Sequence, residues 1–481
     1  MAEKINPVDA VLNAINTECF CIDKETKEVL FKEKNKTINY VYGLNSKKAE
    51  KYFRKIAKDR KLRLRKSNID EIVAEISTYD KDDICEDLVS IRSFYSINND
   101  SVIIDLGDGN SVTLKDGNVE YNKDIDGVCF RSLDTMISMA EPNLDCEFKT
   151  VFKVLKKYVN CTDKQLGLFV AYMTYILAHP KQCKLAYPLL FIQAEQGSGK
   201  SFITNNILRG LLDPNVNSSL RLPKKEKDFA IHCNSTFLLQ YDNLSKIRKD
   251  TSDLLCIAVT KGNVATRALY TDSGLSSLHL HAPIVINGIH SSVQESDLAS
   301  RCLWLQLPKL PSAARRAEGE LLAEFEQDKP MIFGCLLKLA AILRQAEKNA
   351  IVKYQSRMMD FVKWLSAMES VLGQKEGTLQ LMYQENVKSL SASGIKDDAL
   401  VIALEKLIKA ECKVKPWSGT PSMLLRHLAD YEPSRYLPSG ASALTRKLNA
   451  LEVSLEAAGI YFELGKSTER YVKISGKPLK N

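Results

Sequence analysis

The sequence predicts a multidomain α/β protein, with a central ligand-binding α/β domain between an N-terminal α+β domain and a C-terminal domain of helices and strands. Three observations predict this class. An apolar strand, Leu189 to Ala194, runs into a glycine-rich loop that opens a helix. Two later apolar strands, Phe237 to Tyr241 and Pro283 to Ile286, lead into polar residues, as parallel strands do at a ligand site. Short strands with turn residues precede and follow this central part.

The loop after the first strand has the pattern of a phosphate-binding P-loop. Backbone N–H groups can face phosphates there, Lys200 offers a charge to the β- and γ-phosphates, and Ser201 offers a hydroxyl to Mg²⁺. The consensus has glycine where this chain has Ala194, and alanine fits unless the position needs a positive φ. We therefore expect ATP and Mg²⁺ at this loop. The expected binding residues are Glu195, Gln196, Gly197, Ser198, Gly199, Lys200, Ser201 and Phe202.

Polar residues at later strand ends predict the rest of this site. Asp242 follows an apolar strand and suits an acid that holds Mg²⁺ through water. Asn243 stands where many such ATPases carry a glutamate, and an amide cannot act as a base. Asn287 ends the next strand, so we expect it to face the γ-phosphate. Arg301, at a helix-to-strand junction, could reach a neighbouring subunit's phosphate or form a structural salt bridge.

The composition is that of an ordinary globular protein. Its 481 residues are 45% apolar and 26% charged, which suffices for several domains with their own cores. No apolar run reaches the ~18 residues of a membrane span, and no hydrophobic leader follows Met1, so we expect a cytoplasmic protein without a membrane partner. The 12 cysteines lack paired metal-ligand spacing and are expected to be reduced and mostly packed.

The N-terminal 75 residues contain a basic segment, Lys51 to Lys66. Its apolar residues, among them Phe53 and Ala57, can face a small core and leave the charged residues on an outer face. Such a face is a candidate DNA-binding surface, although many charge runs are only solvated helix faces. The residues expected on it are Arg54, Lys55, Lys58, Lys61 and Arg65.

The C-terminal residues predict a winged helix. A helix over Pro421–Asp430 precedes a second over Ala441–Ala458, which Ser439 is expected to cap. Two strands around a Gly-Lys-Ser-Thr turn follow. Arg446 and Lys447, on the second helix, are expected DNA contacts, although such folds also serve as protein contacts.

Changes in pattern along the chain divide it into five parts. The strands of Ser96–Asn122 form a small β-rich module, and the helical pattern of Phe148–Leu177 leads into the P-loop strand. The expected parts are a DNA-binding domain (1–75), a β-rich connecting module (76–146), an ATPase core (147–312), a helical region (313–410) and the winged helix (411–481).

The order of the motifs resembles a known family. The P-loop, YDN, ATRALYTD, PIVINGI and DLASRCLWLQLP together resemble the AAA+ ATPase module of RepA-like replication initiators carried by phages and phage satellites. That module is similar to the D5-type superfamily 3 helicases. FRSLDTM, RMMDF and WSGT also look like this family, and Ser300-Arg301 looks like the arginine-finger motif of minichromosome-maintenance helicases. The resemblance covers roughly residues 95 to 475.

The resemblance implies roles for the residues named above. Lys200 and Ser201 would belong to Walker A, Asp242 and Asn243 to Walker B, Asn287 would be sensor 1, and Arg301 a finger that acts in trans. It also implies a hairpin that contacts DNA in a central channel. The candidates for this contact are Lys261, Arg267 and Tyr270, although relatives often read Gly-Gly-Gly where this chain has Lys261-Gly262-Asn263.

We therefore expect an ATP-dependent DNA helicase and replication initiator of a phage-like mobile element. It would bind double-stranded origin DNA and single-stranded DNA, assemble as a homo-oligomeric ring, a hexamer, and hydrolyse ATP between subunits. No primase motif is visible, so a host or element primase and other replication proteins are expected partners. Two alternatives remain: a small-molecule P-loop phosphotransferase, and an ATP-switched DNA-binding or defence-signalling protein without unwinding activity.

Overall fold

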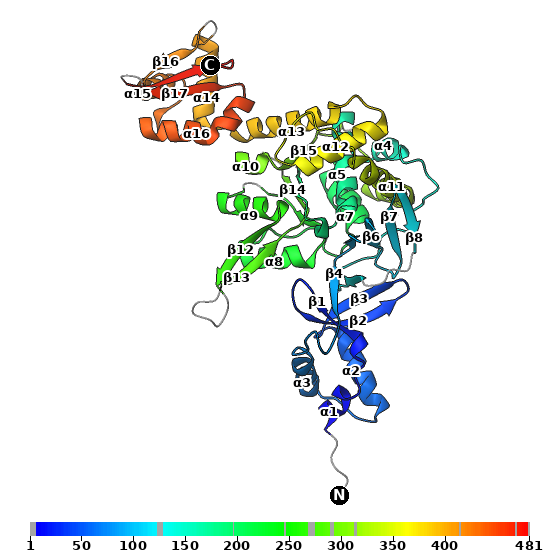
Figure 1. Cartoon of the computed structure of the whole chain (residues 1–481). Helices are drawn as coiled ribbons and strands as arrows, with labels where there is room; N and C mark the ends of the chain where they lie inside the picture. Colours follow the sequence, from blue (N-terminus) through cyan, green and yellow to red (C-terminus); the bar gives the residue numbers. More distant parts are fainter. Residues whose placement is uncertain are drawn as a thin grey trace.

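The computed structural model describes residues 6–122, 128–195, 197–244, 247–267, 275–288, 293–311, 315–412, 415–466 and 469–479. The chain is mixed α/β, as the sequence predicts, and has three parts in a row (Figure 1). An N-terminal unit and a C-terminal unit lie at opposite ends of a central parallel sheet with its helices. No helix among the described residues is long and apolar enough to cross a membrane.

The N-terminal unit is a small closed barrel covered by helices. The strands follow the order β1-β2-β3-β9-β4 around the barrel, and the aromatic side chains of Phe20, Phe31 and Phe53 pack between the barrel and the helices. Its elements are α1 (Pro7–Leu12), η1 (Thr17–Cys19), β1 (Phe20–Asp23), β2 (Val29–Asn35), β3 (Ile38–Gly43), α2 (Lys47–Asp59), α3 (Lys66–Ile76), β4 (Glu86–Ser90) and β9 (Val128–Arg131).

The predicted boundary at residue 75 is wrong because it cuts this barrel. Strand β4 pairs in parallel with β1, and strand β9 pairs in parallel with both β3 and β4. Two of the five barrel strands thus come from the segment that we predicted to be a separate connecting module.

The remaining strands of that segment form an antiparallel sheet, ordered β5-β6-β7-β8. One face meets the barrel, where Ile103 packs with Tyr40 and Phe130. The other face joins the central core through Val102 and Leu114. The four strands are β5 (Ser93–Ser96), β6 (Ser101–Asp105), β7 (Ser111–Lys115) and β8 (Asn118–Tyr121).

The central sheet is parallel and brings the predicted site motifs to one edge. Its strands are β10 (Leu189–Ala194), β11 (Leu239–Tyr241), β14 (Ile284–Gly288) and β15 (Cys302–Leu307), in the order β11-β14-β10-β15. Ile192 lies opposite Asn287, and Tyr241 lies opposite Ile286. The carboxyl ends of β10, β11 and β14 therefore lie side by side.

Helices on both faces bury this sheet. All residues of Leu168–Ala178 in α5 are buried, which explains why this helix is apolar all round. A hairpin, β12 (Gly262–Arg267) with β13 (Leu275–Leu280), projects from the sheet on the same side as the N-terminal unit (Figure 1). The helices are α4 (Thr150–Leu155), α5 (Asp163–Ala178), η2 (Lys181–Cys183), α6 (Lys200–Phe202), the π-helical η3 (Ile203–Leu208), α7 (Arg209–Leu212), α8 (Glu226–Ser235), α9 (Lys249–Val259), α10 (Ser296–Ala299), α11 (Glu318–Glu347), α12 (Met359–Leu372) and α13 (Thr378–Ile395).

The C-terminal unit has helices packed on an antiparallel sheet of order β16-β18-β17. Its elements are α14 (Ala399–Glu411), β16 (Trp417–Gly419), α15 (Pro421–Leu428), η5 (Ser434–Tyr436), α16 (Ala441–Ala457), β17 (Tyr461–Lys466) and β18 (Arg470–Ser475). The name winged helix stays a prediction for this arrangement.

Two expectations for this unit are wrong. Leu400 and Leu404 of α14 share one core with Leu424 of α15, so the unit begins before the predicted boundary at residue 411. Gly440 is the N-cap residue of α16, and no side chain caps the helix there, so Ser439 does not have the predicted capping role.

A buried cluster of charged residues joins the N-terminal strands to the central unit. Arg92, between β4 and β5, places Nε 3.3 Å from Oδ1 of Asp213, and Arg209 of α7 places a guanidinium nitrogen 3.2 Å from Oδ2. The Oδ2 atom also accepts a hydrogen bond from the backbone N–H of Leu238, just before β11. All three charged side chains are almost completely buried. The helix that follows the P-loop, strand β11 and the N-terminal strands therefore meet at one carboxylate.

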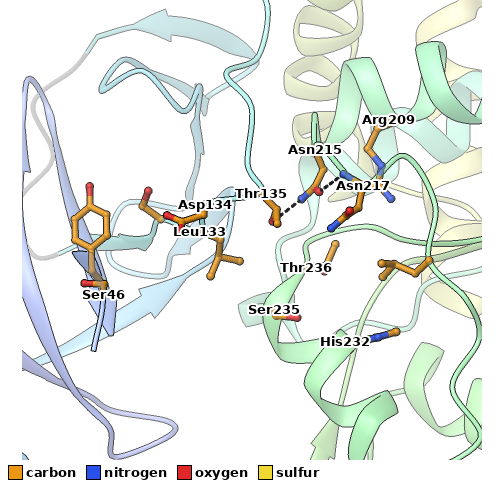
Figure 2. A pocket seen from close by; sticks show the side chains of 13 residues that line it. Ser46, Leu133, Asp134, Thr135, Arg209, Asn215, Asn217, His232, Ser235 and Thr236 are labelled. Atoms are coloured by element: carbon orange, nitrogen blue, oxygen red, sulfur yellow. Dashed lines mark hydrogen bonds between the residues drawn. The ribbon is translucent and has the colours of Figure 1, made fainter. Parts of the chain in front are cut away.

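A cavity of about 390 Å³ lies beside this cluster, between the barrel and the central unit (Figure 2). Ser46 and Asp134 line one side, and Arg209 and His232 line the other. Asn215 donates a hydrogen bond across the junction to Thr135. The predicted P-loop is not part of this cavity.

Candidate nucleotide-binding site

The predicted P-loop has the backbone that phosphate binding requires. Gly197 and Gly199 have φ of 81° and 84°, in the left-handed region that glycine adopts without strain. Ala194 ends strand β10 in extended backbone, so the departure from the glycine consensus is accommodated. Ser198 donates a hydrogen bond of 2.7 Å to the carbonyl of Glu195 and closes the loop. Lys200 then begins the helix, which puts free backbone N–H groups at the loop.

A cavity of about 890 Å³ opens over this loop. The predicted binding residues from Glu195 to Phe202 that the structure describes line it, while Gln196 lies outside the described residues. Apolar side chains also line it, among them Leu321 and the ring of Tyr158, which stacks on that of Phe202. A cavity of this size with a phosphate-binding loop and partly apolar lining suits a nucleotide.

The predicted Walker B acid lies next to the P-loop lysine. The Nζ of Lys200 is 3.7 Å from Oδ1 of Asp242, which is too long for a hydrogen bond. The Asp242 side chain is 42% exposed, and Ser201 is exposed at the same edge. A hydroxyl and a carboxylate with free coordination positions suit Mg²⁺, which keeps several waters.

Asn287 holds the turn that carries the acid. Its Oδ1 accepts a hydrogen bond of 2.9 Å from the backbone N–H of Asn243, and its carbonyl accepts one from Leu244. Asn243 has φ of 57°, so this turn is sharp. The structure therefore brings Asn287 to the predicted site, where its side chain fixes the end of β11.

Gln240, which the sequence analysis did not single out, supports the helix that follows the P-loop. Its Nε2 donates a hydrogen bond of 3.1 Å to the carbonyl of Thr204, and both residues are buried. Thr204 lies in the π-helical stretch that follows the P-loop, and such stretches often mark functional sites. A polar residue within the apolar run that includes Leu238 and Leu239 was the available indication in the sequence.

Arg301 lies at the opposite edge of the sheet from the other predicted residues. Leu189, the first residue of β10, pairs with Cys302, so Arg301 is level with the amino end of the P-loop strand. Its NH1 donates bonds of 2.7 Å to the carboxylate and to the carbonyl of Asp297, and the side chain is only 12% exposed. Arg357 contacts the same carboxylate at 2.5 Å. Burial acts to raise the pKa of Asp297, but the bond to Arg301 and the two positive charges hold it below its ordinary value.

The basic residues predicted on the N-terminal unit are all exposed. They do not form one helix face, because α2 ends at Asp59 and Lys61 turns the chain with φ of 57°. Arg54 is held by Glu50 at 2.7 Å and by the carbonyl of Leu64. The residues concerned are Arg54, Lys55, Lys58, Lys61 and Arg65.

The other predicted DNA-contact residues differ in exposure and in whether they are already paired. Lys261 is exposed where the β12–β13 hairpin begins. Arg267 ends β12, although its side chain lies outside the described part, as does Tyr270. Arg446 is exposed on α16, whereas Lys447 forms a salt bridge of 2.8 Å with Asp398 and is therefore already paired.

The central and C-terminal units match known families. Residues 153–383, which include the whole predicted site, match the family described as actinomycete integrative conjugative element replication protein. Residues 400–480 match the AICE RepA C-terminal domain. These segments, together more than half of the chain, are those of a replication protein of a mobile element. The chain belongs to the RepA replication protein family of actinomycete integrative conjugative elements. The expected class, a replication protein of a mobile element, is confirmed; the matched family is that of an integrative conjugative element, where we expected a phage-like element.

More distant structures align with nearly the whole chain. A structure of the C-terminal region of NrS-1 has a TM-score of 0.42 at 9% identity and covers 98% of both chains. Two more structures of this region each have a TM-score of 0.38. The first has 10% identity and covers 98% of this chain and 99% of its own. The second has 9% identity and covers 99% of this chain and 100% of its own. These scores carry no conclusion about function. None of the curated proteins compared with the chain matches it.

Proposed function

We propose that this replication protein is an ATP-driven DNA helicase and initiator that works as a ring of AAA+ subunits. One observation carries the proposal: the predicted catalytic groups lie at two opposite edges of one sheet. Lys200 and Asp242 lie at the carboxyl edge, and Arg301 lies at the amino edge. Strand β10 has six residues, so these edges are about 20 Å apart. A guanidinium at this distance from its own P-loop can act only on a nucleotide held by another copy.

This geometry suggests a role for each residue of the site. The backbone N–H groups at Gly197 and Gly199 and the Lys200 ammonium would bind the phosphates, while Ser201 and Asp242 would hold Mg²⁺, which neutralises the charge on the transferred phosphoryl group. Arg301 of a neighbouring copy would complete the site and stabilise the charge that develops on the γ-phosphate. Because each subunit would give one edge and receive the other, the contact would be head to tail, and we propose that the rotation between subunits closes it into a ring.

The basic surfaces support DNA as the substrate. Exposed lysines and arginines at the end of α2 and in the following turn give the N-terminal unit a positively charged tip. The β12–β13 hairpin projects toward the same side of the central sheet (Figure 1). We propose that the hairpin contacts the DNA backbone inside the ring and that the N-terminal unit contacts origin DNA, since backbone contacts alone carry no sequence information.

ATPase and strand-displacement assays on the full chain test this function. We expect single-stranded DNA to stimulate ATP hydrolysis, and we expect ATP to drive displacement of an annealed strand. Lys200→Ala should abolish both activities and leave the thermal unfolding midpoint unchanged, because Lys200 supports no core. Hydrolysis without DNA stimulation would favour the phosphotransferase, and stimulation without strand displacement would favour an ATP-switched DNA-binding protein.

The salt dependence of DNA binding tests the basic tip. Replacement of Lys55 and Lys58 by alanine should lower the slope of log K against log salt by about 2, since each lost phosphate contact removes about 0.9. Lys24 and Lys34, exposed elsewhere on the same unit, provide the matched control. Equal slopes for the two double variants would remove the tip from the DNA-binding surface.

A further inference from the structure

Among the described residues, five cationic side chains line the cavity over the P-loop. They come from the segment after α4, from the P-loop itself and from the segment before α11, and they are Lys156, Lys157, Lys200, Arg315 and Arg316. Each cation must be neutralised by a carboxylate, by solvent or by a ligand. The carboxylates that the chain supplies therefore show which cations are available to bind a phosphate.

Three of these cations form short ion pairs. Lys156 lies 2.6 Å from Asp163. Lys157 lies 2.9 Å from Asp328, and Arg316 lies 2.7 Å from Glu324. Among the residues that the structure describes, the carboxylate contact of Lys200 is that of 3.7 Å with Asp242.

Arg315 differs from its neighbours because it has no carboxylate partner in the part of the chain that the structure describes. Its guanidinium instead lies directly over the P-loop. A Cβ atom built on Gly197 would come within 3.2 Å of one guanidinium nitrogen of Arg315 and 3.6 Å of the central guanidinium carbon. Glycine suits this position because of its positive φ, and a larger residue there would also press against this guanidinium.

We propose that Arg315 binds the terminal phosphates of the nucleotide held by its own subunit. This inference rests on the proposed nucleotide site and adds a residue to it. The planar guanidinium can donate two parallel hydrogen bonds to phosphate oxygens and is always charged. Arg315 follows β15 on the segment that leads into α11, so phosphate binding would tie that segment to the P-loop.

The division of roles between the two neighbouring arginines gives the test. Arg316 lines the same cavity but is already paired, so Arg316→Ala is the matched control for Arg315→Ala. Binding of ATP, ADP and AMP to the full chain with Mg²⁺ is measured by competition against a fluorescent ADP analogue. Thermal unfolding without nucleotide shows that each variant is folded.

We expect Arg315→Ala to weaken ATP and ADP binding about 10- to 100-fold, the scale for loss of a charged hydrogen bond. AMP binding should change by less than about threefold, since AMP lacks the terminal phosphates. Arg315→Lys should keep part of the affinity, and Arg316→Ala should stay within about threefold of the wild-type chain for all three nucleotides.

Two results would overturn the proposal. The first is equal ATP affinity in Arg315→Ala and Arg316→Ala. The second is a loss of AMP binding as large as the loss of ATP binding, which would show that Arg315 only shapes the cavity. Failure of the wild-type chain to bind any of the nucleotides would instead refute the proposed nucleotide site.

Discussion

The two edges of the central sheet differ in how completely their polar groups are paired. At the carboxyl edge, Lys200 and Asp242 are 3.7 Å apart and Asp242 is 42% exposed, so both retain bonding capacity for a ligand. At the amino edge, Arg301 is 12% exposed and makes two bonds of 2.7 Å to Asp297. Under the proposed function, the carboxyl edge would be open for a nucleotide of the same subunit, and the amino edge would hold Arg301 until a neighbouring subunit brings the phosphate.

In the proposed ring, Asp297 could hold and release Arg301 because this carboxylate has a second arginine partner. Arg357 is 54% exposed and contacts the other carboxylate oxygen at 2.5 Å. If Arg301 turns toward a phosphate, the carboxylate keeps one guanidinium. The group of Asp297, Arg301 and Arg357 has a net positive charge, which would favour an approaching triphosphate in the proposed ring.

The largest expected effect comes from mixing two inactive variants, one altered at the carboxyl edge and one at the amino edge of the sheet. Lys200→Ala and Arg301→Ala should each lower hydrolysis about 10³-fold or more, and Arg301→Ala should still bind ATP. In an equal mixture with random assembly, about a quarter of the interfaces combine an intact Lys200 with an intact Arg301, so about a quarter of wild-type turnover should return. No recovery at any ratio, with normal turnover for Arg301→Ala alone, would show that the amino edge plays no part in hydrolysis.

A second test concerns the hydrogen bond by which Asn287 of β14 holds the turn that carries Asp242. Asn287→Asp keeps an acceptor for the N–H of Asn243 but loses the amide donor and adds negative charge near the expected γ-phosphate. We expect hydrolysis to fall about 100-fold, the scale for losing one donor that stabilises the transition state. Thermal unfolding should change little, whereas Asn287→Ala should also lower stability. Wild-type turnover in Asn287→Asp would restrict this residue to a structural role.

If Asp297 only holds Arg301 in place, its replacement should have a smaller effect on ATP hydrolysis. Asp297→Asn should change turnover by less than about tenfold because the Arg301 guanidinium remains, in contrast to Arg301→Ala. The unfolding free energy should fall by about 1 kcal/mol, since the carboxylate is half exposed. Steady-state ATPase assays and chemical denaturation measure the two effects. A loss of turnover as large as that of Arg301→Ala would assign the carboxylate a direct part in the reaction.

The smallest expected effect is a pH dependence of stability at the amino edge. His281, just before β14, donates a hydrogen bond to the carbonyl of Leu185 and stacks on Tyr187. Burial lowers its pKa from 6.5 to about 4, because the charged form is poorly solvated there. The unfolded chain therefore takes up this proton more readily, so stability is present above pH 6.5 and is lost as the pH falls toward 4. The unfolding midpoint of His281→Gln should fall less than that of the wild type over this interval.

The sequence allowed the central part to be predicted well because its information is local. An apolar strand followed by Gly197-Ser198-Gly199-Lys200 specifies both an element and a loop, and the polar ends of β11 and β14 had to share an edge with that loop once the strands were parallel. The helix-to-strand junction at Arg301 was correctly placed for the same reason. The chemistry of these residues stays a prediction.

The parts that could not be predicted depend on contacts between distant segments. Closure of the barrel requires β1 to pair with β4, and nothing near Asp23 indicates a partner such as Asp87. Arg315 lies in no motif and reaches Gly197 only through the fold. Lys447 looked free for DNA until its partner Asp398, distant in sequence, came beside it.

The buried pairing of Arg92 and Arg209 with Asp213 affects how this chain could recombine with its relatives. An exchange that brought a foreign N-terminal segment without an equivalent of Arg92 would leave Asp213 with one guanidinium fewer at a site closed to water, and loss of one partner of a buried charge is costly. Because Asp213 also accepts a hydrogen bond from the backbone just before β11, the loss would also disturb the strand that leads to Asp242. Viable hybrids should therefore inherit the barrel, the β5–β8 sheet and the P-loop helix as one block, although only the later part of that block lies within the family match.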